Sequence, residues 1–379
     1  MVPQGPTPGN QALTQSEQLA CGAELTAAPL VRDALVELLQ HEVSAWAGRG
    51  LDVRKERTVR RVFRGRLAGV DVHFLVVESY GRFAWRHPDV RPALVAGIER
   101  WSNQLAAGGV AMRTGAVAPS VLGGASQRSH AEMLGGLKVK DNQTWEMVIA
   151  SELVPLSKHM RNAGWHTVEM MPQMPFHWVE GYEFYGVEQG LAEPELPYDG
   201  FVYHFGRIPD QYGLHRLLKD AIEPAEKPVF SMFVSVSSHA PWSTVPRYIE
   251  DWQIDAATFR SEPAIRHPFS YADIPHAAGL TTAYRDAVTY ALECAFGFVQ
   301  QLQRPSLVFV VGDHQPPIAR SAQPADPTKD VPIHILTNRS ELLARLDELG
   351  FSAGLQLPEA CRSFPMADLA PALLRLYSK

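Results

Sequence analysis

Four segments of the chain carry side chains that together could transfer a phosphoryl or sulfuryl group with the help of a metal ion. They supply a carboxylate, a hydroxyl near a glycine-rich turn, a histidine and an Asp-His pair, and the residues are Glu78, Ser129, His239, Asp313 and His314. The runs before Glu78, His239 and Asp313 are rich in valine and phenylalanine, which is typical of buried strands. Since ligands bind beyond the carboxyl ends of the strands in open α/β sheets, we expect the four segments to meet at one edge.

Each residue type has a chemical task at such a site. Glu78, Asp313 and His314 offer carboxylate oxygens and one imidazole nitrogen, a set that suits one divalent ion such as Mn²⁺, our first choice, or Zn²⁺ or Mg²⁺. A serine hydroxyl is a weak nucleophile until metal coordination lowers its pKa, and Ser129 would be activated in this way. A glycine-rich turn that opens a helix presents N–H groups to an anion. His239 would bind a phosphate oxygen or protonate the leaving alkoxide.

Each of these residues taken alone also has a structural explanation. A glutamate after a strand is usually a surface residue, and a serine in a glycine-rich turn most often caps the helix that follows. The sequence Gly312-Asp313-His314 is more specific, because burying adjacent ionisable groups is costly without a partner ion. The presence of all four features at the ends of predicted strands is what favours an active site.

Strands and helices are predicted to alternate around these segments. Strand-like runs cover 70–77, 109–116, 165–171, 229–236, 307–311 and 331–336, and helical patterns cover 92–107, a stretch from about 129, 158–163, 209–221, 282–303, 341–349 and 366–377. Such alternation predicts an α/β fold of three layers, in which a mostly parallel central sheet carries helices on both faces. We expect residues 1–66 to form an N-terminal extension and residues 67–379 to form one catalytic domain.

The composition indicates a globular protein. Of the 379 residues, 46% are hydrophobic and 20% are charged, and the formal net charge is −6, which excludes a polyelectrolyte that coats nucleic acid. Three cysteines far apart show neither a disulfide framework nor zinc-ligand spacing. Without a signal peptide or an apolar run of about 18 residues, we expect a soluble chain as given. The basic stretch from Arg54 to Arg66 suits either a solvated connector or contact with a membrane surface.

The same residues resemble the alkaline phosphatase/sulfatase superfamily, and more narrowly the catalytic domains of lipoteichoic acid synthases and related phosphoglycerol and phosphoethanolamine transferases. The resemblance runs from about Val70 to Thr337. In that group the metal ligands come from a Glu-Ser pair after the first strand, here Glu78-Ser79, and from a Gly-Asp-His sequence, here 312–314. The nucleophile lies in a small glycine-containing turn, where Ser129 is our match and Ser126 is its rival. A Ser/Asn-His-x-Pro element matches residues 238–241.

The resemblance implies a metal-dependent phosphodiesterase or phosphotransferase that acts through a covalent phosphoserine. Its substrates would be phosphoglycerol or phosphoethanolamine-type esters, either small molecules or lipid-linked, at the extracytoplasmic face of a membrane. Segments similar to substrate-side elements of the family add four binding candidates, His177, Trp178, His204 and Arg207. A sulfate-ester hydrolase on the same scaffold and a non-catalytic binder of a lipid head group or cell-wall polymer remain alternatives.

Three features depart from the family pattern. The nucleophile is a serine, where the transferases use threonine. Gln315, followed by two prolines, stands where the family has a glycine after Asp-His, so the contacts around the ligands must differ. The Cys/Ser-x-Pro-x-Arg element of the formylglycine sulfatases is absent, which argues against true sulfatase activity.

Overall fold

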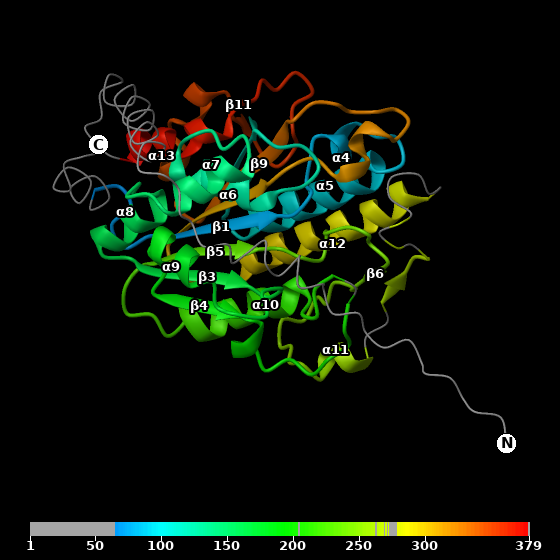
Figure 1. Cartoon of the computed structure of the whole chain (residues 1–379), viewed down its shortest axis with the longest axis horizontal. Coiled ribbons are helices and arrows are strands. Elements are labelled where there is room, and N and C mark those ends of the chain that lie inside the picture. Colours follow the sequence, from blue (N-terminus) through cyan, green and yellow to red (C-terminus); the bar gives the residue numbers. More distant parts are fainter. Residues whose placement is uncertain are drawn as a thin grey trace. The chain divides into compact units, whose positions relative to one another are not determined.

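A nine-stranded sheet forms the centre of the computed structural model, which describes residues 65–203, 205–261, 264–268, 270, 272 and 279–377 (Figure 1). The strand order is β10-β2-β9-β8-β1-β5-β3-β4, and β11 pairs with β2. The strands are β1 (Asp71–Val77), β2 (Ala111–Ala118), β3 (His166–Met171), β4 (Gln189–Ala192), β5 (Val229–Val234), β8 (Ser306–Gly312), β9 (Val331–Thr337), β10 (Ser352–Ala353) and β11 (Phe364–Pro365). A separate antiparallel pair joins β6 (Thr244–Val245) to β7 (Ile265–Arg266).

Strands β1 and β8 lie side by side and parallel at the middle of the sheet, with Val77 opposite Gly312. Every residue of both strands is buried. Parallel strands of this kind are near-continuous hydrophobic runs because helices cover both faces of the sheet. Phe74 of β1 stacks on Phe309 of β8, with ring centroids 4.6 Å apart. The loops after β1 and β8 therefore start next to each other at one edge of the sheet.

Helices pack on the sheet in two groups (Figure 1). One group contains α5 (Arg91–Ala107), α10 (Asp210–Leu217), which continues as a π-helical turn at Leu218–Ile222, and α12 (Leu280–Gln301). The other contains α6 (Ser126–Gly135), α7 (Asn142–Ile149), α8 (Leu156–Ala163), α9 (Val179–Tyr185) and α13 (Leu369–Tyr377). Short helices α4 (Phe83–Arg86) and α11 (Thr258–Ser261) lie in connections. The predicted α/β fold, a mostly parallel central sheet with helices packed around it, is confirmed.

The structure differs from the sequence expectation in three local features. The sheet is parallel from β8 to β4, but β9 runs antiparallel to both β8 and β2. The predicted helix at 341–349 consists of two 3₁₀ turns, Ser340–Leu343 and Leu346–Leu349. Helix α6 begins at Ser126, one turn earlier than expected. Gly123 and Gly124 have positive φ values of 73° and 142°, and Ala125 is left-handed, so the chain turns sharply before the helix begins.

Two predictions fall on residues outside the described part of the chain. The first concerns the N-terminal extension and its basic stretch, of which residues 1–64 are not described. The second concerns His204. Among the residues that the structure does describe, no helix combines the length and apolar character needed to cross a membrane.

Candidate active site

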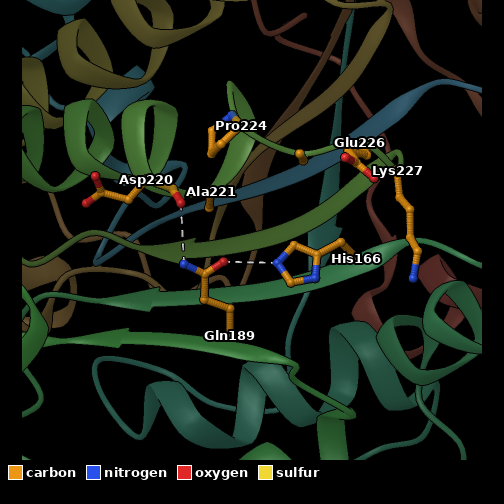
Figure 2. A pocket seen from close by; sticks show the side chains of 8 residues that line it. His166, Gln189, Asp220, Ala221, Pro224, Glu226 and Lys227 are labelled. Carbon is orange, nitrogen blue, oxygen red and sulfur yellow. Dashed lines mark hydrogen bonds between the residues drawn. The ribbon is translucent and has the colours of Figure 1, made fainter.

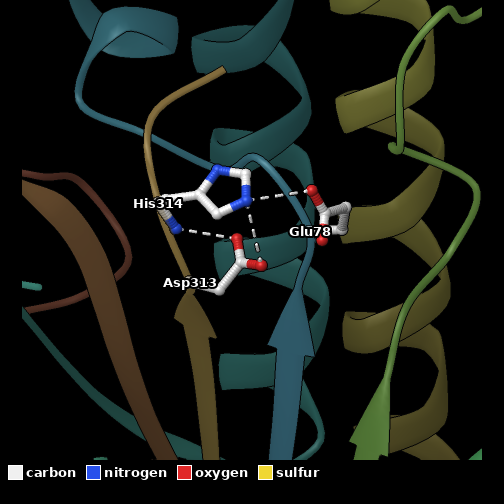
Figure 3. A group of neighbouring side chains, drawn as sticks. All are labelled: Glu78, Asp313 and His314. Atoms are coloured by element: carbon white, nitrogen blue, oxygen red, sulfur yellow. Dashed lines mark hydrogen bonds and ion pairs between the residues drawn. The ribbon is translucent and has the colours of Figure 1, made fainter. Parts of the chain in front are cut away.

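Glu78, Asp313 and His314 form a buried group at the carboxyl ends of β1 and β8 (Figure 3). Nε2 of His314 lies 3.2 Å from Oε1 of Glu78 and 3.6 Å from Oδ2 of Asp313. One donor atom from each residue lies within 4.8 Å of the others. The group forms because Val77 pairs with Gly312, so that the next residues of the two strands are brought together. The structure thus brings together three of the four predicted metal ligands, with Glu78 more than 230 residues before the Asp313-His314 pair, and the fourth, Ser129, is not in this group.

Hydrogen bonds to the main chain orient this group. Oδ1 of Asp313 accepts hydrogen bonds from the backbone N–H of Ser79 at 2.8 Å and of His314 at 2.7 Å. Nδ1 of His314 donates to the carbonyl oxygen of Gln315 at 2.8 Å, which leaves Nε2 to face the carboxylates. Gly312 has to be a glycine, since a Cβ there would overlap the carbonyl oxygen of Tyr80.

The electrostatics of the group favour a cation between its members. Burial and the nearby Glu78 carboxylate raise the pKa of Asp313. Burial opposes the charge of His314, but Asp313 and Glu78 outweigh it and raise the pKa of the imidazole. Burial would likewise raise the pKa of Glu78, and His314 outweighs this effect and lowers it. Oδ2 of Asp313 is buried without a hydrogen-bond partner. Two carboxylates, one of them with a buried oxygen that accepts no hydrogen bond, and one imidazole fit a divalent cation.

Of the two serines considered as nucleophile, Ser126 is the one that the structure brings against this group. Its Oγ donates a hydrogen bond to Oε2 of Glu78 at 2.8 Å and lies 3.1 Å from Nε2 of His314. Ser129, one turn further along α6, is 1% exposed, and its Oγ has no hydrogen-bond partner. Ser126 is the first residue of α6, where the first turn of a helix presents backbone N–H groups to an anion.

The turn that carries His239 also holds Glu78 in place. Oγ of Ser235 accepts a hydrogen bond from the backbone N–H of Glu78 at 3.0 Å, and Oγ of Ser238 donates to its carbonyl oxygen at 2.7 Å. Burial raises the pKa of Glu78, and the imidazole of His239 adds to the stronger effect of His314 in lowering it. The His239 ring stacks on Phe205, with ring centroids 3.5 Å apart. The predicted phosphate-binding histidine thus lies within electrostatic reach of the carboxylate.

Asp210 anchors the same turn from the start of α10. Its Oδ1 accepts hydrogen bonds from the backbone N–H of Val236 at 2.8 Å and of Ser237 at 3.3 Å. The side chain is fully buried, and burial raises its pKa to about 7 despite these hydrogen bonds. This contact explains why an aspartate follows the Gly-Arg-Ile-Pro sequence of the preceding loop.

The remaining predicted binding residues have other partners. His177 pairs with Glu195 through Nε2 and Oε1 at 2.6 Å, and Trp178 stacks on Trp145 with centroids 5.7 Å apart. Arg207 forms an exposed ion pair with Glu193. Among the contacts of described residues, the structure records no hydrogen bond from His177, Trp178 or Arg207 to the metal-ligand group.

His130 is a site residue that the sequence analysis did not select. It lies one turn after Ser126 on α6 and is 6% exposed, and its Nε2 is buried without a hydrogen-bond partner. Burial lowers its pKa to about 4, and its charge interacts with Glu78 and His314. The spacing of four residues from Ser126, which places both side chains on one helix face, is the signal that could have identified it.

A cavity of about 340 Å³ lies elsewhere, at the amino ends of β3 and β4 (Figure 2). Gln189 bridges it, contacting Nε2 of His166 at 2.9 Å and donating to the carbonyl oxygen of Asp220 at 3.5 Å. Since β3 is parallel to β5 and β5 to β1, this cavity is at the end of the strands opposite to Glu78. It is separate from the metal-ligand group.

No protein-family model matches the sequence, and no curated protein does. Solved structures do match. The C-terminal periplasmic domain of EptC from Escherichia coli gives a TM-score of 0.51 at 10% identity, covering 82% of each chain. A protein of the alkaline phosphatase superfamily from Vibrio parahaemolyticus gives 0.50 at 15% identity, covering 86% of this chain and 76% of the other. The lipoteichoic acid synthase LtaP from Listeria monocytogenes gives 0.49 at 14% identity, covering 82% and 72%.

At sequence identities this low, the structural similarity is a similarity of backbone fold. It extends over more than four fifths of the chain for the first two structures, and it agrees with the central sheet and helices described above. The chain has the alkaline phosphatase/sulfatase fold.

Proposed function

We propose that the protein is a metal-dependent enzyme that cleaves or transfers a phosphodiester through a phosphoserine formed on Ser126. The observation that carries this proposal is the position of the Ser126 hydroxyl, hydrogen-bonded to Glu78 and 3.1 Å from His314 within a buried group of two carboxylates and an imidazole. Ser126 therefore takes the nucleophile role instead of Ser129, whose hydroxyl is enclosed in the protein interior.

Glu78, Asp313 and His314 would hold one divalent cation, which supplies positive charge for the serine oxygen and the phosphoryl oxygens when it is bound. Mn²⁺ is the ion we propose first, with Zn²⁺ and Mg²⁺ also suited to these donors. The hydroxyl hydrogen of Ser126 points to Oε2 of Glu78, the atom that receives it as Oγ attacks phosphorus.

The reaction then proceeds in two displacements. A bond forms between Oγ of Ser126 and phosphorus while the bond from phosphorus to the leaving alcohol breaks, and His239 donates a proton to the oxygen of that alcohol. In the second displacement the oxygen of a water molecule or of a second alcohol bonds to phosphorus and gives its proton to His239, while the bond from phosphorus to Oγ of Ser126 breaks and Glu78 returns the proton to Oγ. Water gives hydrolysis, and an alcohol gives transfer.

The substrate class follows from the resemblance of the site motifs. Phosphoglycerol and phosphoethanolamine-type esters, small or lipid-linked, are the substrates we propose. Contact of the basic stretch from Arg54 to Arg66 with a membrane surface, and an extracytoplasmic location, belong to the same proposal. His177, Trp178 and Arg207 would contact substrate only if it displaces their present partners.

The test is incubation of the protein with bis(4-nitrophenyl) phosphate and Mn²⁺, followed by peptide mass spectrometry. We expect nitrophenol release and a 4-nitrophenyl phosphoryl adduct on Ser126, and the Ser126→Ala variant is expected to lose both. An adduct on Ser129 would overturn the nucleophile assignment. Faster cleavage of an aryl sulfate would indicate the sulfate-ester hydrolase, and stoichiometric metal without turnover of any ester would indicate a binding protein.

A further inference from the structure

Gln315 is the residue that departs from the family resemblance directly beside the metal-ligand group. It follows Asp313 and His314 and is fully buried, with an exposed fraction of 0%. A glycine at this position could make no side-chain contact, so the amide of Gln315 supplies contacts that the usual residue of the family pattern could not make.

The Gln315 side chain joins the loop after β8 to the loop after β1. Its Oε1 accepts a hydrogen bond from the backbone N–H of Phe83 at 3.0 Å, and its Nε2 donates to Oγ1 of Thr328 at 3.2 Å. The Thr328 hydroxyl donates to Oδ1 of Asp326 at 2.6 Å, and Oδ2 of Asp326 pairs with Arg86 at 3.2 Å. Phe83 and Arg86 are the two ends of α4, so the chain of contacts starts and finishes on that helix.

Only one assignment of donors and acceptors fits these hydrogen bonds. The Phe83 N–H can only donate, so the amide oxygen of Gln315 must face it. The Thr328 hydroxyl donates to a carboxylate and therefore accepts from the amide nitrogen. A methionine would keep the length of the side chain but make neither hydrogen bond. The site thus requires both ends of a glutamine amide.

Gly81 provides the space that Gln315 occupies. A Cβ on Gly81 would overlap the amide group of Gln315 and lie 2.8 Å from its Cα. Gly81 is three residues after Glu78, and Gln315 is two residues after Asp313. The loops after β1 and β8, which carry the metal-ligand group, therefore pack against each other at this point. Apart from this contact, the hydrogen bond from the Ser79 N–H to Asp313 joins the same loops.

We propose that Gln315 is a positioning residue that sets the spacing between Glu78 and the Asp313-His314 pair and thereby tunes metal affinity. This proposal rests on the proposed function, because it takes these residues to be metal ligands. Partners outside the ligand set typically change metal affinity or activity by about 10- to 100-fold when they are removed.

The experiment compares Gln315→Met with Gln211→Met. Gln211 is the matched control, because it is also fully buried and its amide also makes two hydrogen bonds, to the carbonyl oxygen and N–H of Ile249 at 2.6 Å and 3.0 Å. These contacts join α10 to a loop that carries no proposed ligand. The Kd for Mn²⁺ is measured by calorimetric titration, and thermal stability by circular dichroism. Thr328→Val is the milder variant if Gln315→Met does not fold, because it removes the acceptor of Nε2 and the hydroxyl bond to Asp326 but keeps the hydrogen bond from the Phe83 N–H to Oε1 of Gln315.

We expect both methionine variants to lose thermal stability, but only Gln315→Met to bind Mn²⁺ about 10-fold or more weakly than the wild type. Thr328→Val should weaken binding in the same direction by a smaller factor. If Gln315→Met or, failing its folding, Thr328→Val binds Mn²⁺ like the wild type, or if Gln211→Met weakens binding equally, the role of Gln315 is structural and the proposal is overturned. If the wild type itself binds no divalent ion, the proposed function fails first, and this proposal fails with it.

Discussion

Oγ of Ser126 lies 2.8 Å from Oε2 of Glu78, although the two residues are 48 positions apart in the sequence. The contact joins the first residue of a helix on one face of the sheet to the first residue beyond the central strand. This contact is the reason why we propose Ser126, and not Ser129, as the nucleophile of the 123–132 segment. Most of the predictions below depend on this geometry or on the contacts that hold it.

Replacing Ser126 with alanine is expected to reduce kcat/KM for a phosphodiester by about 10³-fold or more, because the group that attacks phosphorus is lost. Ser129→Ala is the matched control on the same helix. Its Oγ is buried without a partner, so its removal should leave activity within about threefold and raise the free energy of unfolding by up to about 1 kcal/mol. Steady-state kinetics and urea denaturation measure both quantities. Equal losses of activity in the two variants would contradict the assignment.

Removing divalent ions with a chelator is expected to lower the melting temperature. An ion that binds only the folded state stabilises it by about 2.7 kcal/mol at a concentration 100 times its Kd. Asp313→Asn should abolish the response to added Mn²⁺, since it removes a buried carboxylate from the ligand group. Asp347→Asn, at an exposed residue paired with Arg113, is the control. Scanning calorimetry with and without Mn²⁺ provides the measurement, and a normal Mn²⁺ response in Asp313→Asn would rule out this ligand set.

The buried His334 is expected to make the fold sensitive to acid. Its Nε2 contacts the Tyr80 hydroxyl at 2.9 Å, and its Nδ1 contacts Thr114 at 2.8 Å. Thr114 donates its own hydrogen to a carbonyl oxygen, so Nδ1 carries the imidazole hydrogen. Burial lowers the pKa of His334 to about 3, from 6.5.

Between these two pKa values the unfolded chain binds a proton that the folded protein does not, so stability falls as the pH drops below about 6.5. The contribution of one such group has a slope of up to about 1.4 kcal/mol per pH unit. In His334→Gln the free energy of unfolding should fall less steeply between pH 6 and pH 4 than in the wild type. Denaturant titrations at each pH test this, and an unchanged slope would show that His334 is not the titrating group.

Asp210 is expected to act in the opposite pH direction. Burial raises its pKa to about 7 from 3.8, so the folded protein retains a proton that the unfolded chain releases, and stability declines as the pH rises between these values. Asp210→Asn keeps a carbonyl oxygen for the N–H groups of Val236 and Ser237, and should remove this decline. Asp210→Ala should instead destabilise the protein by about 1–3 kcal/mol at pH 5, because two buried N–H groups lose their acceptor. Equal stability of the Asn and Ala variants would argue against the anchoring role.

The chemical types at the site and the strands that carry them could be read from local sequence. Glu78 and Asp313 follow hydrophobic runs that become β1 and β8, and parallel strands of one sheet end at the same edge. To predict the metal-ligand group from the sequence, one therefore had to assume only that β1 and β8 belong to one parallel sheet. The direction of β9 was not readable in this way, since antiparallel and parallel strands buried on both faces have the same hydrophobic pattern.

Our proposal of Ser126 over Ser129 as nucleophile depends on the tertiary structure alone. Both are serines near one glycine-rich turn, and their local sequence supports either role. The left-handed conformation of Ala125 starts the helix at Ser126, and the packing of that helix points Ser126 toward Glu78 and encloses Ser129. The contacts of Gln315 are likewise known only from the tertiary structure. Hydrogen bonds between residues 48 to 232 positions apart depend on how the loops meet, and local composition carries no information about that distance.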